Sequence, residues 1–127
     1  MDPGGPVLVV DDNATFREAT RLVLEAAGYR VACAADGREA LDYLGRHGPP
    51  LLILLDLNMP VLDGGGFRQE QRRVRAWRGV PVVLVSSEAD VGRQATALGV
   101  AGYFRKPVEF GELLTLVRGI VGGPPAR

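Results

Sequence analysis

Several residue types are nearly absent from this 127-residue sequence, and each absence excludes a class of protein. Cys33 is the only cysteine, so an internal disulfide is impossible, and a reducing compartment is the simple expectation. No apolar run approaches the roughly 18 residues that span a bilayer, and no charged segment followed by an apolar one opens the chain. We therefore expect a cytoplasmic protein that makes no contact with a membrane.

An excess of either charge is also missing, since 15 basic residues balance 15 acidic ones. Such a balance creates no field that would hold nucleic acid or an anionic membrane surface. The only histidine, His47, stands in a predicted turn. The sequence therefore argues against a zinc site built from histidine and cysteine, and against a catalytic triad of serine, histidine and aspartate.

The length and the apolar content of 46% are typical of one globular domain, which we assign to residues 6–121. Residues 1–5 and 122–127 are rich in glycine and proline, which predicts flexible tails. The second tail could equally be the start of a linker.

The most informative stretch is the run of five apolar residues at 51–55, which ends at Asp56. Prolines bound the run on both sides, and it is too short for a buried helix, which needs about 10 residues. It therefore predicts a strand that is buried on both faces. Ligands bind at the carboxyl ends of strands in open α/β sheets. Asp56 is either a cap of a turn or helix, or a reactive carboxylate, and this stretch alone leaves both open.

Strand patterns alternate with helical patterns along the whole chain. The strands are predicted at 6–10, 29–34, 51–55, 81–86 and 103–105, and the helices at 16–27, 37–44, 63–77, 90–98 and 109–121. This alternation with short loops predicts an α/β fold, a doubly wound, flavodoxin-like parallel sheet of five strands in the order 2-1-3-4-5. On the first helix, the apolar residues expected to face the core are Phe16, Ala19, Leu22, Val23, Ala26 and Ala27.

Polar residues follow the apolar strands at the same end of the predicted sheet. They are Asp11 and Asp12 after the first strand, Asp56 after the third, Ser86 after the fourth and Lys106 after the fifth. Parallel strands bring these ends to one edge, so three carboxylates should converge there with a hydroxyl and an ammonium group. Clustered carboxylates repel one another unless a cation lies among them, and an all-oxygen set favours a hard ion such as Mg²⁺.

Lys106 is the only lysine among the 15 basic residues, the other 14 being arginine. Lysine carries a compact, rotatable charge that can approach a phosphoryl group, whereas guanidinium is a wide planar fork. A chance placement of the one lysine at this edge has odds of roughly one in 15. We therefore expect Lys106 to have a chemical role.

Four motifs together resemble the receiver domain of two-component response regulators. They are Val7-Leu8-Val9-Val10-Asp11-Asp12, Leu55-Asp56-x-Asn58-Met59-Pro60-x-x-Asp63-Gly64, the strand 81–86 that ends in Ser86, and Lys106-Pro107. The resemblance implies that Asp56 is phosphorylated by a sensor histidine kinase or a histidine phosphotransfer protein. It also implies a Mg²⁺ site made by Asp11, Asp12, Asp56 and the backbone carbonyl of Asn58. Such a domain is a phosphoacceptor that catalyses its own phosphorylation and dephosphorylation, rather than an enzyme acting on a separate substrate.

The resemblance further implies a switch made by Ser86 and Tyr103. Ser86 matches the hydroxyl residue that moves toward the phosphoryl group, although threonine is more usual there, and Lys106 matches the lysine that pairs with that group. Tyr103 matches an aromatic residue that changes rotamer on activation. Glu88 and Pro107 are also included among the candidate site residues, and the Lys106–Pro107 bond is often cis in this family.

Partner binding is expected on the face made by helices 90–98 and 109–121 around Tyr103. Helix 90–98 has a thin apolar stripe and contains Gly92, so it should be marginal and able to move. Leu116 falls outside the inward stripe of the last helix and is a candidate apolar contact for an effector or a second copy of the chain.

Other readings remain at this point. One is an interaction module on the same fold that is not phosphorylated. Another is an enzyme with Asp56 as nucleophile, similar to the haloacid dehalogenases, although that group requires a second aspartate where Asn58 stands. Finally, the arginines at 68, 72, 75 and 78 form either a stripe that binds nucleic acid or a kinase surface, or a solvated helix face. We expect the solvated face, because no aromatic residues interleave with them.

Overall fold

The computed structural model describes residues 5–124, in which five strands alternate with five helices. The strands are β1 (Val7–Val10), β2 (Val31–Ala34), β3 (Leu52–Leu55), β4 (Val82–Ser86) and β5 (Gly102–Arg105). The helices are α1 (Ala14–Ala26), α2 (Gly37–His47), α3 (Gly64–Arg73), α4 (Val91–Leu98) and α5 (Phe110–Val121). The predicted tails at 1–5 and 122–127 fall largely on residues 1–4 and 125–127, which lie outside this range, so that expectation stays a prediction.

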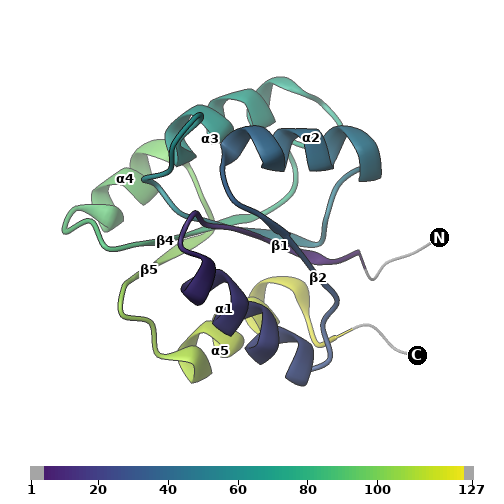
Figure 1. Ribbon diagram of the computed structural model, residues 1–127, viewed down its shortest axis with the longest axis vertical. Coiled ribbons are helices and arrows are strands. Elements are labelled where there is room, and N and C mark those ends of the chain that lie inside the picture. The colour runs from purple at the N-terminus through teal and green to yellow at the C-terminus, as the bar shows by residue number, and fades with distance from the viewer. Residues whose placement is uncertain (1–4, 125–127) are drawn as a thin grey trace.

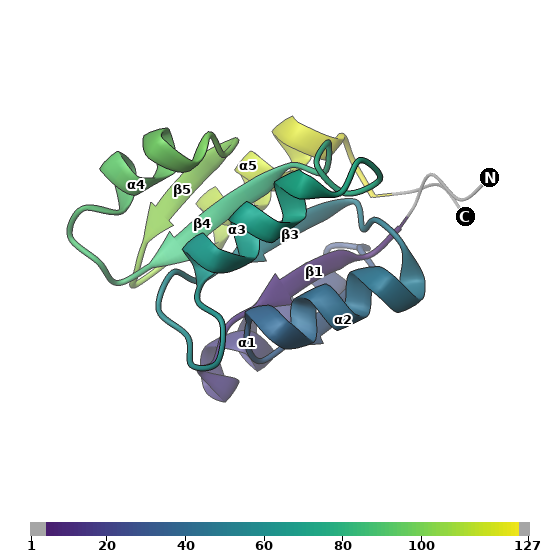
Figure 2. The same ribbon diagram turned by 90° about the horizontal axis from the view of Figure 1, so that it is seen from above.

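All strands are parallel and form one sheet in the order β2-β1-β3-β4-β5, which confirms the predicted topology. Helices α1 and α5 cover one face of the sheet, and α2, α3 and α4 cover the other (Figure 1). Figure 2 looks onto the second face, with α2 and α3 in front of the strands. The result is a three-layer α/β sandwich.

The core has two halves, one on each face of the sheet. Alternate residues of a strand enter different halves, so that Val7 and Val9 pack toward α1 and α5 while Leu8 and Val10 pack toward α2 and α3. Every residue of β1, β3 and β4 is buried. This double burial is the reason that these strands are apolar runs without alternation. It also means that the first polar residue after each strand marks the edge of the sheet.

Helix α3 begins unusually close to the end of β3. A Cβ atom on Gly64 would lie 2.4 Å from the carbonyl oxygen of Asp56 and 2.9 Å from the Cα of Leu57, so only glycine fits. Asp63 caps the helix, because its side chain accepts a hydrogen bond from the backbone N–H of Gly66. The chain can therefore turn back tightly over the end of β3.

The predicted inward face of α1 was partly wrong. Leu22 and Ala26 are exposed, and the buried residues of this helix are Thr20 and Leu24. Thr20 can be buried because its hydroxyl donates to the carbonyl oxygen of Phe16, 2.8 Å away, within the same helix. The polar group is satisfied there, which a pattern of apolar residues alone does not reveal.

Helix α3 is shorter than predicted and ends at Arg73 instead of Trp77. The buried side chain of Gln71 donates to the carbonyl oxygens of Trp77 and Val80 at 2.9 and 3.1 Å, and these bonds hold the following residues in turns. Trp77 still packs against the core from this turn.

The expected solvated arginine face was also wrong for one of its members. Arg68 is only 8% exposed, and its guanidinium donates to the carbonyl oxygens of Leu98 and Gly99 and to the side chain of Gln71. Arg72, Arg75 and Arg78 are exposed as expected. Arg68 therefore ties α3 to the C-terminal end of α4, where unpaired carbonyl groups and the helix dipole favour a cation.

A membrane-spanning helix is not found within residues 5–124, where none of the helices is both long and apolar enough to cross a bilayer.

Candidate functional site

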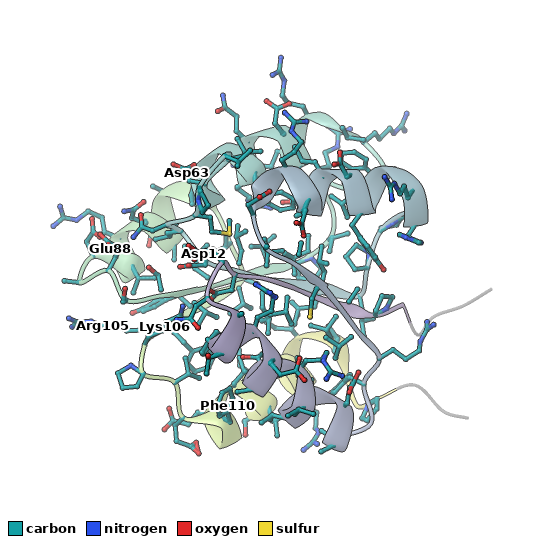
Figure 3. The ribbon with its side chains drawn as sticks, in the orientation of Figure 1. Asp12, Asp63, Glu88, Arg105, Lys106 and Phe110 are labelled. Atoms are coloured by element: carbon teal, nitrogen blue, oxygen red, sulfur yellow. The ribbon has the colours of Figure 1, made fainter. Side chains whose placement is uncertain are left out.

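The polar residues that follow the strands meet at one edge of the sheet. Asp11 follows β1, Asp56 follows β3, Ser86 ends β4 and Lys106 follows β5. The register aligns these positions, because Val10 pairs with Leu55, Leu55 with Leu84 and Ser86 with Arg105. Figure 3 shows Asp12, Glu88 and Lys106 gathered at this end of the molecule.

Three carboxylates form the centre of the site. One oxygen from each of Asp11, Asp12 and Asp56 lies within 4.8 Å of the other two. Asp11 and Asp56 are buried, the latter only 6% exposed, while Asp12 is exposed to solvent. Asp11 Oδ1 also accepts the backbone N–H of Asn13 at 2.9 Å. The sequence-based expectation that these three residues converge is met by their geometry.

This environment disfavours the charged form of Asp56. Burial, and after it the neighbouring Asp11 carboxylate, raise the pKa of the Asp56 carboxyl group to about 6. Lys106 and the backbone N–H of Asn58 act in the opposite direction. Carboxylates crowded in this way are relieved by a hard cation, and the all-oxygen donor set fits a divalent ion such as Mg²⁺.

Lys106 is held between the carboxylates and an aromatic ring. Its Nζ lies 2.8 Å from Asp11 Oδ2, 4.0 Å from Asp56 Oδ2 and 4.4 Å from the centre of the Phe16 ring. The Lys106–Pro107 peptide bond is cis, and the backbone N–H of Lys106 donates to the carbonyl oxygen of Ser86 at 2.8 Å. The one lysine of the sequence therefore lies beside Asp56, within reach of a group bound there.

Ser86 is fully buried, and its hydroxyl is turned toward the loop that follows β4. Ser86 Oγ accepts the backbone N–H of Glu88 at 3.1 Å. The Glu88 carboxylate in turn accepts the side-chain amide of Asn58 at 2.7 Å, which links the loops after β3 and β4. The structure therefore places Glu88 and Asn58 in a hydrogen-bonded pair at the rim of the site.

Tyr103 does not belong to this cluster. It lies on β5 with 51% of its surface exposed, and its ring packs against α4, where a Cβ on Gly92 would lie 3.0 Å from ring atoms. Leu116, which was expected to be a free apolar contact on the same face, is partly buried and packs against the core beside Gly102.

Two contacts at the site were missed by sequence reasoning. Arg17 donates to the carbonyl oxygen of Asp11 at 2.6 Å, a contact that the spacing of apolar residues does not predict. Phe16 contacts Lys106, although its spacing identified it simply as a core residue. The contact of Phe16 has no local signal, because Phe16 and Lys106 are 90 residues apart in the sequence.

Comparison with known proteins places this chain in one family. The response regulator receiver domain matches residues 7–118. The probable transcriptional regulator ycf27 of Porphyridium aerugineum is 38% identical over 117 residues, which cover 91% of this chain and 47% of that protein. The chain thus spans about half the length of such curated relatives.

Solved structures agree with this assignment. The chemotaxis response regulator CheY4 of Vibrio cholerae is 32% identical with a TM-score of 0.82, covering 91% of this chain and 98% of that one. The receiver domain of sensor histidine kinase PA1611 from Pseudomonas aeruginosa is 30% identical with a TM-score of 0.84, covering 94% of this chain and 99% of that one. That structure has a magnesium ion coordinated in its active site cleft. From its sheet order, its acidic edge and its match over residues 7–118, this chain belongs to the response regulator receiver domain family.

Proposed function

We propose that Asp56 accepts a phosphoryl group from the phosphohistidine of a sensor histidine kinase or a histidine phosphotransfer protein. The observation that carries this proposal is the position of Asp56, which shares one site with two further carboxylates and the ammonium of Lys106, 4.0 Å away. Receiver domains work with such donors, and the architecture of a known receiver with bound magnesium supports the same role here.

The chemistry requires few groups from the protein. A carboxylate oxygen of Asp56 forms the new bond to phosphorus while the bond from phosphorus to the donor's imidazole nitrogen breaks, and the imidazole leaves. Phosphoryl transfer depends mainly on positioning and on neutralised oxygens. Bound by Asp11, Asp12, Asp56 and the backbone carbonyl of Asn58, Mg²⁺ would supply part of that neutralisation. A water molecule later cleaves the acyl phosphate and restores the carboxylate.

Lys106 and Ser86 supply the other two contacts to the phosphoryl oxygens in this proposal. Lys106 needs only to shift its ammonium from Asp11 Oδ2 toward Asp56. Ser86 Oγ is the acceptor in its bond with the Glu88 N–H, so its own proton can still be donated to a phosphoryl oxygen. That movement would pull on the loop between β4 and α4, because Glu88 follows Ser86 by two residues.

The phosphorylation proposal is tested with acetyl phosphate and Mg²⁺, followed by mass spectrometry of the intact protein. The wild type should gain one labile phosphate, and Asp56→Asn should gain none, because the amide has no nucleophilic oxygen anion. Asp42→Asn, on the exposed surface of α2, is the matched control and should be phosphorylated normally. Equal phosphate on the wild type and Asp56→Asn would refute the assignment, and an unmodified wild type would favour an interaction module that is not phosphorylated.

We also propose that the signal leaves through the face made by α4, β5 and α5 around Tyr103, toward an effector or a second copy of the chain. The exposed ring of Tyr103 and the short α4 beneath it support this choice. Amide exchange with and without beryllofluoride, which mimics the phosphoryl group, tests it. Changes should concentrate in residues 86–105 and at the start of α5, and they should vanish in Asp56→Asn. Changes confined to residues 64–78 would contradict the proposal.

A further inference from the structure

The ammonium of Lys106 has an unusual set of neighbours. Carboxylate oxygens lie on one side, with Asp11 Oδ2 at 2.8 Å and Asp56 Oδ2 at 4.0 Å. On another side lies the ring of Phe16, whose centre is 4.4 Å from Nζ (Figure 3 labels Lys106 and the nearby Phe110). This distance is well inside the roughly 6 Å over which a cation is attracted to the face of an aromatic ring.

The ring of Phe16 is held from two directions. The backbone N–H of Phe16 donates at 2.9 Å to the side chain of Asn13, the N-cap of α1, in the loop that also carries Asp11 and Asp12. The ring stacks against Phe110, the first residue of α5, with ring centres 6.1 Å apart and planes inclined by 25°. The backbone of Phe16 is therefore anchored beside the loop that carries the carboxylates, and its ring packs against the start of α5, four residues after Lys106.

An aromatic ring suits this position for a physical reason. Phe16, Lys106 and Phe110 line an open hollow of about 590 Å³, so without the ring this side of the ammonium would face water. A carboxylate in its place would bind the ammonium strongly and draw it away from Asp56. The ring attracts the charge through its quadrupole and accepts no conventional hydrogen bond, so the N–H groups of Lys106 stay available for oxygens.

We propose that Phe16 is a positioning residue for Lys106: its ring holds the ammonium beside Asp56 and shields it from water while leaving its hydrogen bonds for the phosphoryl group. The contact itself follows from the geometry, and its role in phosphorylation rests on the function proposed above. An aliphatic residue of similar size would fill the same space without providing this attraction. Phe16→Leu and Phe16→Tyr therefore separate packing from the cation–π contact.

The contact can be measured without metal or phosphate because Lys106 is the only lysine. Protein labelled with ¹³C-lysine gives a single ε-methylene NMR signal. In the wild type and in Phe16→Tyr, the ring current should move these protons upfield of their position in free lysine. In Phe16→Leu the shift should vanish, and in Phe104→Leu, which loses a ring from the same half of the core, it should remain. An unchanged shift in Phe16→Leu would overturn the proposed contact.

The role of the contact is measured by the rate of phosphorylation with acetyl phosphate at saturating Mg²⁺. Phe16→Leu should be slower by about threefold to tenfold, the range expected for losing a partly shielded cation–π contact. Phe16→Tyr and Phe104→Leu should stay within about twofold of the wild type. Equal rates in Phe16→Leu and the wild type, or equal losses in Phe16→Leu and Phe16→Tyr, would overturn the positioning role.

The two proposals fail in different ways. A wild type that is never phosphorylated would overturn the function proposed for Asp56 and the role of Phe16 in it, while the NMR signal would still report the contact. A wild type that is phosphorylated at the same rate as Phe16→Leu would leave the function of Asp56 intact and overturn only the role of Phe16.

Discussion

Asp11 and Asp56 lie at the ends of strands that are buried on both faces, whereas Ser86 leads into a loop and a helix that have much weaker support. On the first side, Asn13 caps α1, Asp63 caps α3, and Gly64 packs directly on the backbone of Asp56. On the second side, α4 has only eight residues, and its N-cap residue Asp90 makes no side-chain capping bond. The helices that follow the carboxylates thus have capped N-terminal ends, whereas the helix that follows Ser86 does not.

The two ends of α4 also differ in how they are bonded to neighbouring elements. Its C-terminal end is tied to α3 by Arg68, which donates to the carbonyl oxygens of Leu98 and Gly99. Its N-terminal end follows the loop that contains Glu88, and this loop is linked to the rest of the described chain through the hydrogen bonds of Glu88 with Asn58 and Ser86. A rigid site beside a helix that is fixed at one end can convert a local change at Ser86 into a movement of the helix. The following predictions test this contrast.

Gly64→Ala should have the largest effect on stability, because it disturbs the close contact between α3 and the end of β3. The new methyl group would lie 2.4 Å from the carbonyl oxygen of Asp56, so α3 or β3 must shift. We expect the free energy of unfolding to fall by about 2 to 3 kcal/mol, measured by urea denaturation. Gly65→Ala is the matched control, since its methyl group would meet nothing closer than 3.7 Å. A similar loss in both variants would show that the packing of Gly64 is not special.

Ionisation of Asp56 should destabilise the metal-free protein. The pKa of its carboxyl group is raised to about 6 in the folded state, above the ordinary value of about 4 that it has in an unfolded chain. The folded state therefore binds the proton more tightly, and this stabilisation is complete below about pH 4 and is lost as the pH rises through about 6.

The measurement is the free energy of unfolding in EDTA for the wild type and Asp56→Asn between pH 4 and pH 7. The wild type should lose on the order of 2 kcal/mol relative to the variant across this range. Parallel pH profiles of the two proteins would show that folding does not raise the pKa of Asp56.

Mg²⁺ should reverse part of this destabilisation by binding to the folded state. At ten times its dissociation constant, an ion that binds only the folded protein adds about 1.4 kcal/mol, which a thermal melt at neutral pH detects. Asp12→Ala should respond much less, since it removes the most exposed of the three carboxylates with little effect on the core. A melting temperature of the wild type that does not change with millimolar Mg²⁺ would contradict the metal site.

The smallest expected effects compare the two helix caps directly. Asn13→Ala removes the acceptor for the Phe16 N–H and should cost about 1 kcal/mol. Asp90→Ala removes no capping bond from α4 and should cost less than about 0.5 kcal/mol. Chemical denaturation of both variants measures the difference. Equal costs would mean that the N-terminal end of α4 is held as firmly as that of α1.

The strand pattern gave a reliable prediction of the fold, because three strands are buried on both faces. Their short apolar runs indicate buried strands, since a buried helix would need a longer run. The parallel alternation then limited the topology, and the polar residue after each strand had to lie at one edge. For this reason the convergence of Asp11, Asp12, Asp56, Ser86 and Lys106 could be predicted without any structure. The roles of these residues in phosphorylation stay predictions, since they depend on chemistry that geometry alone does not test.

The errors occurred where a side chain satisfies its polar group locally or across the fold. Thr20 is buried because it bonds within its own helix, and Gln71 ends α3 by bonding to the turn that follows. Arg68 is buried because the end of α4 supplies carbonyl oxygens about 30 residues further along the chain. Hydrophobic periodicity treats all three as surface residues, since it contains no information about available partners.

The sequence by itself determined the α/β fold, the order of the strands and the edge at which the acidic residues meet, because apolar runs identify the strands and short right-handed connections leave few ways to order them. Only the tertiary structure decided which neighbours each group has. Lys106 meets Asp11 and the ring of Phe16 across 90 or more residues, and Arg68 meets the end of α4 in the same way. Such contacts depend on how elements distant in the sequence are placed against one another by packing on the sheet.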